Sequence, residues 1–295
     1  MEQSALMQWV GSALLFSMML GMGMSMVWAD IRRVVVYPRA VTVGTVNQML
    51  LLPLLGWVLV SLFQPEPAIA LGLILLTLCP GGVGSNVFSL LARGDAALSV
   101  TLTFISSCLI VLSLPLIFHW ALLHFTGHAL SLDLPVTDTM QRVFTLTLVP
   151  LAIGMLIRHY RPEWAQRCEP WVKVGGFVLL GLLIAGIVAK EFARIVDYAQ
   201  RAGGIALGLC VGSMLLGFAS ARLLRLNRPQ SIAIAIETGM QNSALAIVIA
   251  GMLNNPEIAI PAVIYTVFVS LICLGLVLHA QWPWRSAPVA LESRS

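Results

Sequence analysis

Acidic and amide side chains interrupt an otherwise apolar stretch of the chain, Ile234–Leu245, whose sequence is IAIETGMQNSAL. Glu237 is followed within five residues by Gln241 and Asn242. Carboxylate, amide and hydroxyl oxygens are the ligands that hard cations prefer. An ionised acid at the centre of a membrane helix costs at least about 2.5–3.5 kcal/mol, so Glu237 requires a compensating partner.

No basic residue of the chain is available to compensate the charge of Glu237. Of the 13 acidic residues, Glu237 alone lies well inside an apolar segment, and none of the 17 lysines and arginines does. A buried ion pair is therefore excluded. Three possibilities stay open, namely a metal cation from solution, a proton in transit, or a permanently protonated and hydrogen-bonded glutamic acid.

A second unusual stretch, Cys79–Asn86, reads CPGGVGSN. Proline removes a backbone donor and each glycine lowers helix propensity by about 1 kcal/mol, so we expect the helix to break here and again at Thr238–Asn242. Free backbone groups at membrane depth must line a cavity, bind ions or meet another helix. The two segments cross the membrane in opposite directions, which is typical of an inverted-repeat transporter.

The composition predicts an all-α polytopic membrane protein. Hydrophobic residues make up 59% of the 295 residues and charged residues only 10%, against about a quarter in soluble domains. The net charge of +4 is scattered over connecting segments, so no nucleic-acid partner is expected, and no protein partner is predicted. The N-terminal apolar segment is too long for the core of a cleavable signal peptide. The cysteines show no metal-binding spacing and are expected to be small core residues.

Nine apolar segments are candidate membrane spans. Their approximate ranges are 5–28, 40–63, 67–91, 96–122, 140–158, 171–190, 203–224, 230–253 and 259–280. The segment 190–201 is expected to be an outer connection, and 281–295 a polar cytoplasmic tail. Most lysines and arginines fall on one side if the N-terminus is outside and the C-terminus is cytoplasmic, so we expect this orientation in the inner (cell) membrane.

Two motifs of the chain resemble those of the bile acid:sodium symporter family. They are CPGGVGSNVFSLLARGDAALSVTLT (Cys79 to Thr103) and ETGMQNSALA (Glu237 to Ala246). The resemblance extends from the first span to about the ninth. It implies one transporter domain, 1–280, in which two broken helices cross. The core would comprise approximately 40–122 and 203–280, and a small panel approximately 5–28 and 140–190.

The resemblance also implies two Na⁺ sites at the crossing. The first would use Ser85, Asn86, Ser99, Thr103 and Glu237. The second would use Gln48, Glu237, Gln241 and the backbone carbonyls of Thr238 and Met240. Simpler structural roles stay open for three of these residues: Ser99 and Thr103 could bond the carbonyl four residues back, and Gln48 could bond a neighbouring helix.

The interrupted helices also predict an anion site. Each break creates a half-helix N-terminus near the bilayer midplane, where backbone N–H groups and the positive dipole end favour a negative group. We expect a carboxylate at Gly82, Val83 and Asn242, with the Asn242 side chain donating one hydrogen bond. No arginine or lysine reaches that depth, so a monoanion with an apolar body is expected.

The sequence thus predicts a sodium-coupled symporter of an organic monoanion that works by alternating access, in contact only with solute and lipid. Bile-acid-like molecules and small acids such as pantoate or ketopantoate are both open as solutes. An enzyme is not expected, because the histidines lie near span ends and cannot serve as a base beside Ser85. The alternative is a proton-coupled or sodium-independent carrier that uses Glu237 as its proton site.

Overall fold

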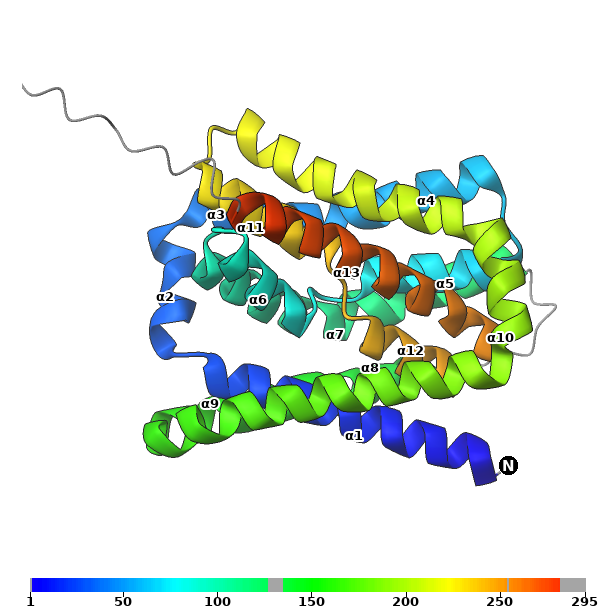
Figure 1. Cartoon of the computed structure of the whole chain (residues 1–295), viewed down its shortest axis with the longest axis horizontal. Helices are drawn as coiled ribbons and strands as arrows, with labels where there is room; N and C mark the ends of the chain where they lie inside the picture. The colour runs from blue at the N-terminus through cyan, green and yellow to red at the C-terminus, as the bar shows by residue number, and fades with distance from the viewer. Residues whose placement is uncertain (1, 127–134, 254, 282–295) are drawn as a thin grey trace, which may run out of the picture.

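The computed structural model describes residues 2–126, 135–253 and 255–281, and its regular elements within these ranges are helices (Figure 1). In chain order they are α1 (Glu2–Ser25), α2 (Trp28–Val36), α3 (Pro38–Val46), the π-helix η1 (Asn47–Leu51), α4 (Leu52–Phe63), α5 (Pro67–Leu78), α6 (Val83–Leu91), α7 (Ala96–Thr126), α8 (Val136–Val143), the π-helix η2 (Phe144–Leu148), α9 (Val149–Tyr160), α10 (Pro162–Leu223), α11 (Arg228–Gly239), α12 (Ser243–Met252), the 3₁₀ helix η3 (Pro256–Ala259) and α13 (Ile260–Gln281). The predicted tail lies outside the described residues from position 282 onward.

The expected all-α polytopic membrane protein is confirmed. Six helices in the described ranges are long and apolar enough to cross a membrane, or up to seven when α1 and α2, which meet at 82°, are taken as one bent span. The pairs α5/α6 and α11/α12 consist of helices that are each too short to cross alone. The number of nine spans therefore stays a prediction.

Both predicted helix breaks are present. Helix α5 ends at Leu78 and α6 begins at Val83, so Pro80 and the two glycines after it are not helical. Helix α11 ends at Gly239 and α12 begins at Ser243. Proline and glycine account for the first break, whereas the second follows Gly239 and is followed by Asn242, which caps α12.

The expected connection at 190–201 is helical, because these residues belong to α10, a single helix of 62 residues that contains two candidate spans, Pro162–Gly186 and Val196–Leu223. Figure 1 shows two arms of α10 on opposite sides of the molecule, joined by a helical turn. The segment has neither glycine nor proline and is rich in Ala, Lys, Glu, Gln and Arg. These residues have high helix propensity, so the chain changes direction without leaving the helix.

The π-helices and the short helix α2 were not predicted. Each π-helix ends just before the proline of the next helix, Pro53 in α4 and Pro150 in α9. A proline ring collides with the carbonyl one turn earlier, and a locally widened turn is one way to accommodate it. The first of these turns carries Gln48.

The helices form two groups in Figure 1, with α1 and the first arm of α10 along one side and α13, α5 and the second arm of α10 along the other. Helix α1 packs against α9, α10 and α12, while α11 packs against α10, α6 and α7. Buried side chains such as Leu15, Leu71 and Ile236 fill one continuous apolar core. Helices α6 and α12, which follow the two breaks, also contact α1.

Candidate ion and solute site

The two broken helices are joined to each other through their backbones. The N–H of Gly82 donates to the carbonyl oxygen of Met240 at 2.8 Å, and the N–H of Asn242 donates to the carbonyl oxygen of Pro80 at 2.9 Å. Gly81 and Gln241 form an antiparallel bridge between these bonds. The crossing therefore satisfies backbone groups that could not face lipid.

The Glu237 side chain lies beside this crossing, 2% exposed, and points toward α6 and α7. The hydroxyl oxygens of Ser85 and Ser99 lie 2.6 and 2.7 Å from Glu237 Oε2, and the Thr103 hydroxyl donates to Oε1. Asn86 completes the group, because its Oδ1 lies 3.5 Å from Thr103 Oγ1. The structure thus brings together all five residues of the first predicted ion site.

This cluster has more oxygen contacts than its protons can satisfy. Ser85 Oγ lies 2.7 Å from the Gly82 carbonyl oxygen as well as beside Glu237, and Thr103 Oγ1 lies 3.0 Å from the Ser99 carbonyl oxygen as well as beside Glu237. A hydroxyl has one proton to donate. Surplus lone pairs around a buried carboxylate suit a cation bound to oxygen, or one extra proton.

Part of the second predicted set lies together, namely Gln48, Gln241 and the Thr238 carbonyl oxygen, whereas the Met240 carbonyl oxygen accepts the Gly82 N–H. Gln48 Nε2 donates to Gln241 Oε1 at 2.7 Å and to the Cys79 carbonyl oxygen at 2.8 Å. Gln241 Nε2 donates to the Thr238 carbonyl oxygen at 2.7 Å. The atom of Glu237 that it approaches is the backbone oxygen, at 3.5 Å, and not the carboxylate. A cation here requires both amides to turn their oxygens inward, and the sharing of the Glu237 carboxylate by two ions stays a prediction.

The predicted anion residues lie at the crossing, but two of the expected donors are already used. The backbone N–H groups of Gly82 and Asn242 bond across the crossing. The backbone donors that remain for an anion are therefore those in the first turns of α6 and α12. Asn242 Oδ1 accepts from Leu245 N at 3.0 Å and caps α12. Its Nδ2 is buried and has no hydrogen-bond partner among the described residues. The amide group, rather than the backbone N–H of residue 242, is therefore the donor available to an anion.

Two site residues were not identified from the sequence. A Cβ on Gly81 would overlap the carboxylate of Glu237, so only glycine lets the acid lie against the crossing. Tyr265 on α13 is fully buried and its hydroxyl donates to the Gly239 carbonyl oxygen at 2.6 Å, at the end of α11. The sequence signal that could have identified Tyr265 as a site residue is the presence of a tyrosine inside an apolar span.

The donor set fits a hard, monovalent cation better than a transition metal. No group of three His, Cys, Asp or Glu side chains suited to a metal occurs in the described part of the chain. The clustered ligands are hydroxyl, amide and carbonyl oxygens with a single carboxylate. Such oxygens suit Na⁺, whose single charge balances one carboxylate.

Comparison with known proteins decides the family. The model of the sodium bile acid symporter family matches residues 12–198. The chain belongs to this family. It is 30% identical over 286 residues to the "Uncharacterized sodium-dependent transporter YocS" of Bacillus subtilis, covering 94% of this chain and 85% of the relative.

Other relatives in the family are longer than this chain. The "Probable sodium/metabolite cotransporter BASS1, chloroplastic" of Arabidopsis thaliana is 32% identical over 276 residues, which is 93% of this chain and 66% of the relative. The human "Ileal sodium/bile acid cotransporter" is 30% identical over 227 residues, which is 75% of this chain and 62% of the relative. The resemblance noted from the two motifs is thereby confirmed, and these relatives are named as transporters rather than enzymes.

Proposed function

We propose that this sodium bile acid symporter family member is a secondary active symporter that carries two Na⁺ ions with one organic monoanion. The observation that carries this proposal is the cluster of Ser85, Ser99 and Thr103 hydroxyls around the buried Glu237 carboxylate. A buried acid surrounded by surplus oxygen lone pairs is stabilised when a cation occupies the cluster. The names of the relatives, which include sodium/metabolite and sodium/bile acid cotransporters, support sodium as that cation.

The two groups of helices support an alternating-access mechanism. The crossing would move with the core, approximately 40–122 and 203–280, against a panel formed by approximately 5–28 and 140–190. Ions bound on both sides of the crossing would order the Met240–Asn242 segment, and with it the Asn242 amide offered to the solute. An inner-membrane location with the N-terminus outside and a cytoplasmic C-terminus agrees with the distribution of Arg and Lys.

The solute we propose is a monoanion with an apolar body, of the bile-acid, pantoate or ketopantoate kind. The Asn242 amide Nδ2 is a buried side-chain donor at the crossing without a hydrogen-bond partner among the described residues, and the Thr238 hydroxyl, which also lacks one, lies beside Gly217 of α10. No basic side chain contacts Glu237, Gln241 or Asn242 in any described interaction, so a second negative charge would lack compensation.

A proton-coupled carrier is the second candidate, because one extra proton on Glu237 would also satisfy the surplus oxygens. The two candidates differ in the ion that drives uptake. With Na⁺ coupling, a Na⁺ gradient at equal pH drives uptake into proteoliposomes. With proton coupling, a pH jump in sodium-free buffer does so.

The test is uptake of a panel of radiolabelled monoanions into proteoliposomes under an imposed inward Na⁺ gradient. Glu237→Gln, which keeps the shape and removes the charge, is expected to abolish Na⁺-driven uptake. Glu163→Gln, at an exposed acid, is the matched control and should transport normally. Full sodium-driven uptake by Glu237→Gln would overturn the assignment of Glu237, and uptake driven only by a pH jump would favour the second candidate.

A further inference from the structure

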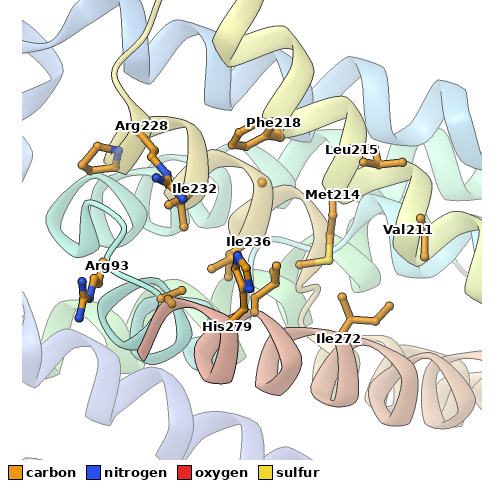
Figure 2. Close-up of a pocket in the computed structure, with 15 residues that line it drawn as sticks. Arg93, Val211, Met214, Leu215, Phe218, Arg228, Ile232, Ile236, Ile272 and His279 are labelled. Atoms are coloured by element: carbon orange, nitrogen blue, oxygen red, sulfur yellow. The ribbon is translucent and has the colours of Figure 1, made fainter. Parts of the chain in front are cut away.

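An apolar groove of about 610 Å³ lies between the second arm of α10, α11 and α13, beside the end of α6 (Figure 2). Its floor is formed by Ile232, Ala235 and Ile236 of α11. Its walls include Val211, Met214, Leu215 and Phe218 from α10 and Ile272 and Leu276 from α13. Leu215 is 63% exposed, so the groove opens along a surface of the kind that faces lipid acyl chains.

The groove is separate from the ion site. Ile236 lines it, whereas the next residue, Glu237, points to the hydroxyls of α6 and α7. Successive residues of a helix point in directions about 100° apart, so the groove and the carboxylate use different faces of α11. The groove lacks the oxygen ligands that a cation needs, and its walls are almost wholly apolar.

One end of the groove is cationic. Arg93 follows α6 and Arg228 begins α11, and both line the groove. Figure 2 shows Arg93 and Arg228 at one end, with Val211 and Ile272 toward the other. Both arginines are exposed, and neither has a carboxylate partner in the described part of the chain.

We propose that this groove binds one anionic phospholipid, with an acyl chain against α11 and the phosphate at Arg93 and Arg228. A guanidinium group matches phosphate geometry, and basic pockets between membrane helices bind lipid head groups. The volume lies in the range that holds a single small ligand, so one acyl chain enters while the rest of the lipid stays in the bilayer. The charge at one end selects an anionic over a zwitterionic lipid.

The charged end is tested by native mass spectrometry of the full chain released from nanodiscs that contain equal amounts of phosphatidylglycerol and phosphatidylcholine. The wild-type protein is expected to retain one phosphatidylglycerol in excess. The double variant Arg93→Gln/Arg228→Gln should lose this preference by about fivefold for each arginine. The control, Arg161→Gln/Arg225→Gln, removes the same charge at exposed positions outside the groove and should keep the preference.

The apolar part is tested without changing charge. Val211→Trp fills the groove and is expected to displace the retained lipid, whereas Leu207→Trp, one turn earlier on α10 and outside the groove, should not. Equal retention of both lipids by the wild type, or an equal loss in the control pair, would overturn the proposal. Displacement of the lipid by a transported monoanion would overturn it as well, because the groove would then be part of the solute path. The lipid-retention measurements on the wild type and the four variants do not depend on sodium-driven uptake.

Discussion

Gly82 N lies 2.8 Å from the carbonyl oxygen of Met240, and this bond has a reciprocal counterpart from Asn242 N to the carbonyl oxygen of Pro80 at 2.9 Å. The two helix breaks therefore position one another through main-chain bonds that side-chain substitutions do not remove. Glu237 and Asn242 lie on either side of the same break. A substitution at Glu237 is therefore expected to shift the position of Asn242, and the reverse, because a short non-helical segment joins them.

Gly81→Ala is expected to impair Na⁺-driven uptake strongly, because the added methyl group would overlap the Glu237 carboxylate. The acid would have to move away from the Ser85 and Thr103 hydroxyls or the crossing would have to widen. Gly175→Ala is the control, since a Cβ there meets nothing within 4 Å. Initial uptake rates and the yield of folded protein should be measured together. Normal uptake by Gly81→Ala would show that the carboxylate is not held at this crossing during transport.

Thr103→Val should raise the Na⁺ concentration needed for half-maximal uptake by about tenfold or more. Valine keeps the shape and removes a hydroxyl that contacts Glu237, and hydrogen bonds to charged groups contribute about 1.5–3 kcal/mol. Thr145→Val is the control, because that hydroxyl is exposed and bonds only the Gln141 carbonyl oxygen. Titration of uptake against Na⁺ at fixed solute distinguishes the two. An unchanged Na⁺ dependence in Thr103→Val would remove this residue from the ion site.

The sequence was sufficient for the features that follow from composition and from helix-breaking residues. The burial of Glu237, the breaks at Pro80 and near Gln241, and the proximity of Ser85, Ser99 and Thr103 all appear in the structure. The three hydroxyl residues were placed together by the family resemblance, since spacing alone puts only Ser99 and Thr103 on one helix face.

Features that depend on tertiary contacts were not predictable. Nothing in the sequence pattern indicated that the connection at 190–201 stays helical within the long helix α10, where the helix propensity and packing of these residues outweigh their polarity. The role of Gly81 required the distance to Glu237, and the use of the Gly82 N–H required its partner on the other broken helix. A single sequence does not specify which carbonyl another segment brings into reach.

An inside-negative membrane potential is expected to accelerate uptake at a fixed Na⁺ gradient. If two Na⁺ ions move with one monoanion, one net positive charge enters per cycle, and each 100 mV adds about 2.3 kcal/mol to the driving force. The measurement is initial uptake into proteoliposomes with a potassium diffusion potential set by valinomycin. The control uses equal potassium on both sides. A rate insensitive to the potential would indicate electroneutral coupling and one Na⁺ ion per monoanion.

Asn242→Ala is expected to raise the apparent KM for the solute more than the apparent KM for Na⁺, because it removes the unpartnered Nδ2 donor at the crossing. Alanine also removes the cap of α12, worth about 1 kcal/mol, so Asn242→Ser provides the necessary comparison. Serine restores a capping oxygen but not the amide donor, so it should recover folding yield while KM for the solute stays high. Uptake kinetics of both variants, with a neutral amide analogue of the best monoanion as competitor, provide the readout. If Asn242→Ser transports the anion with wild-type KM, or if the neutral analogue competes equally well, the anion does not bind at this half-helix end.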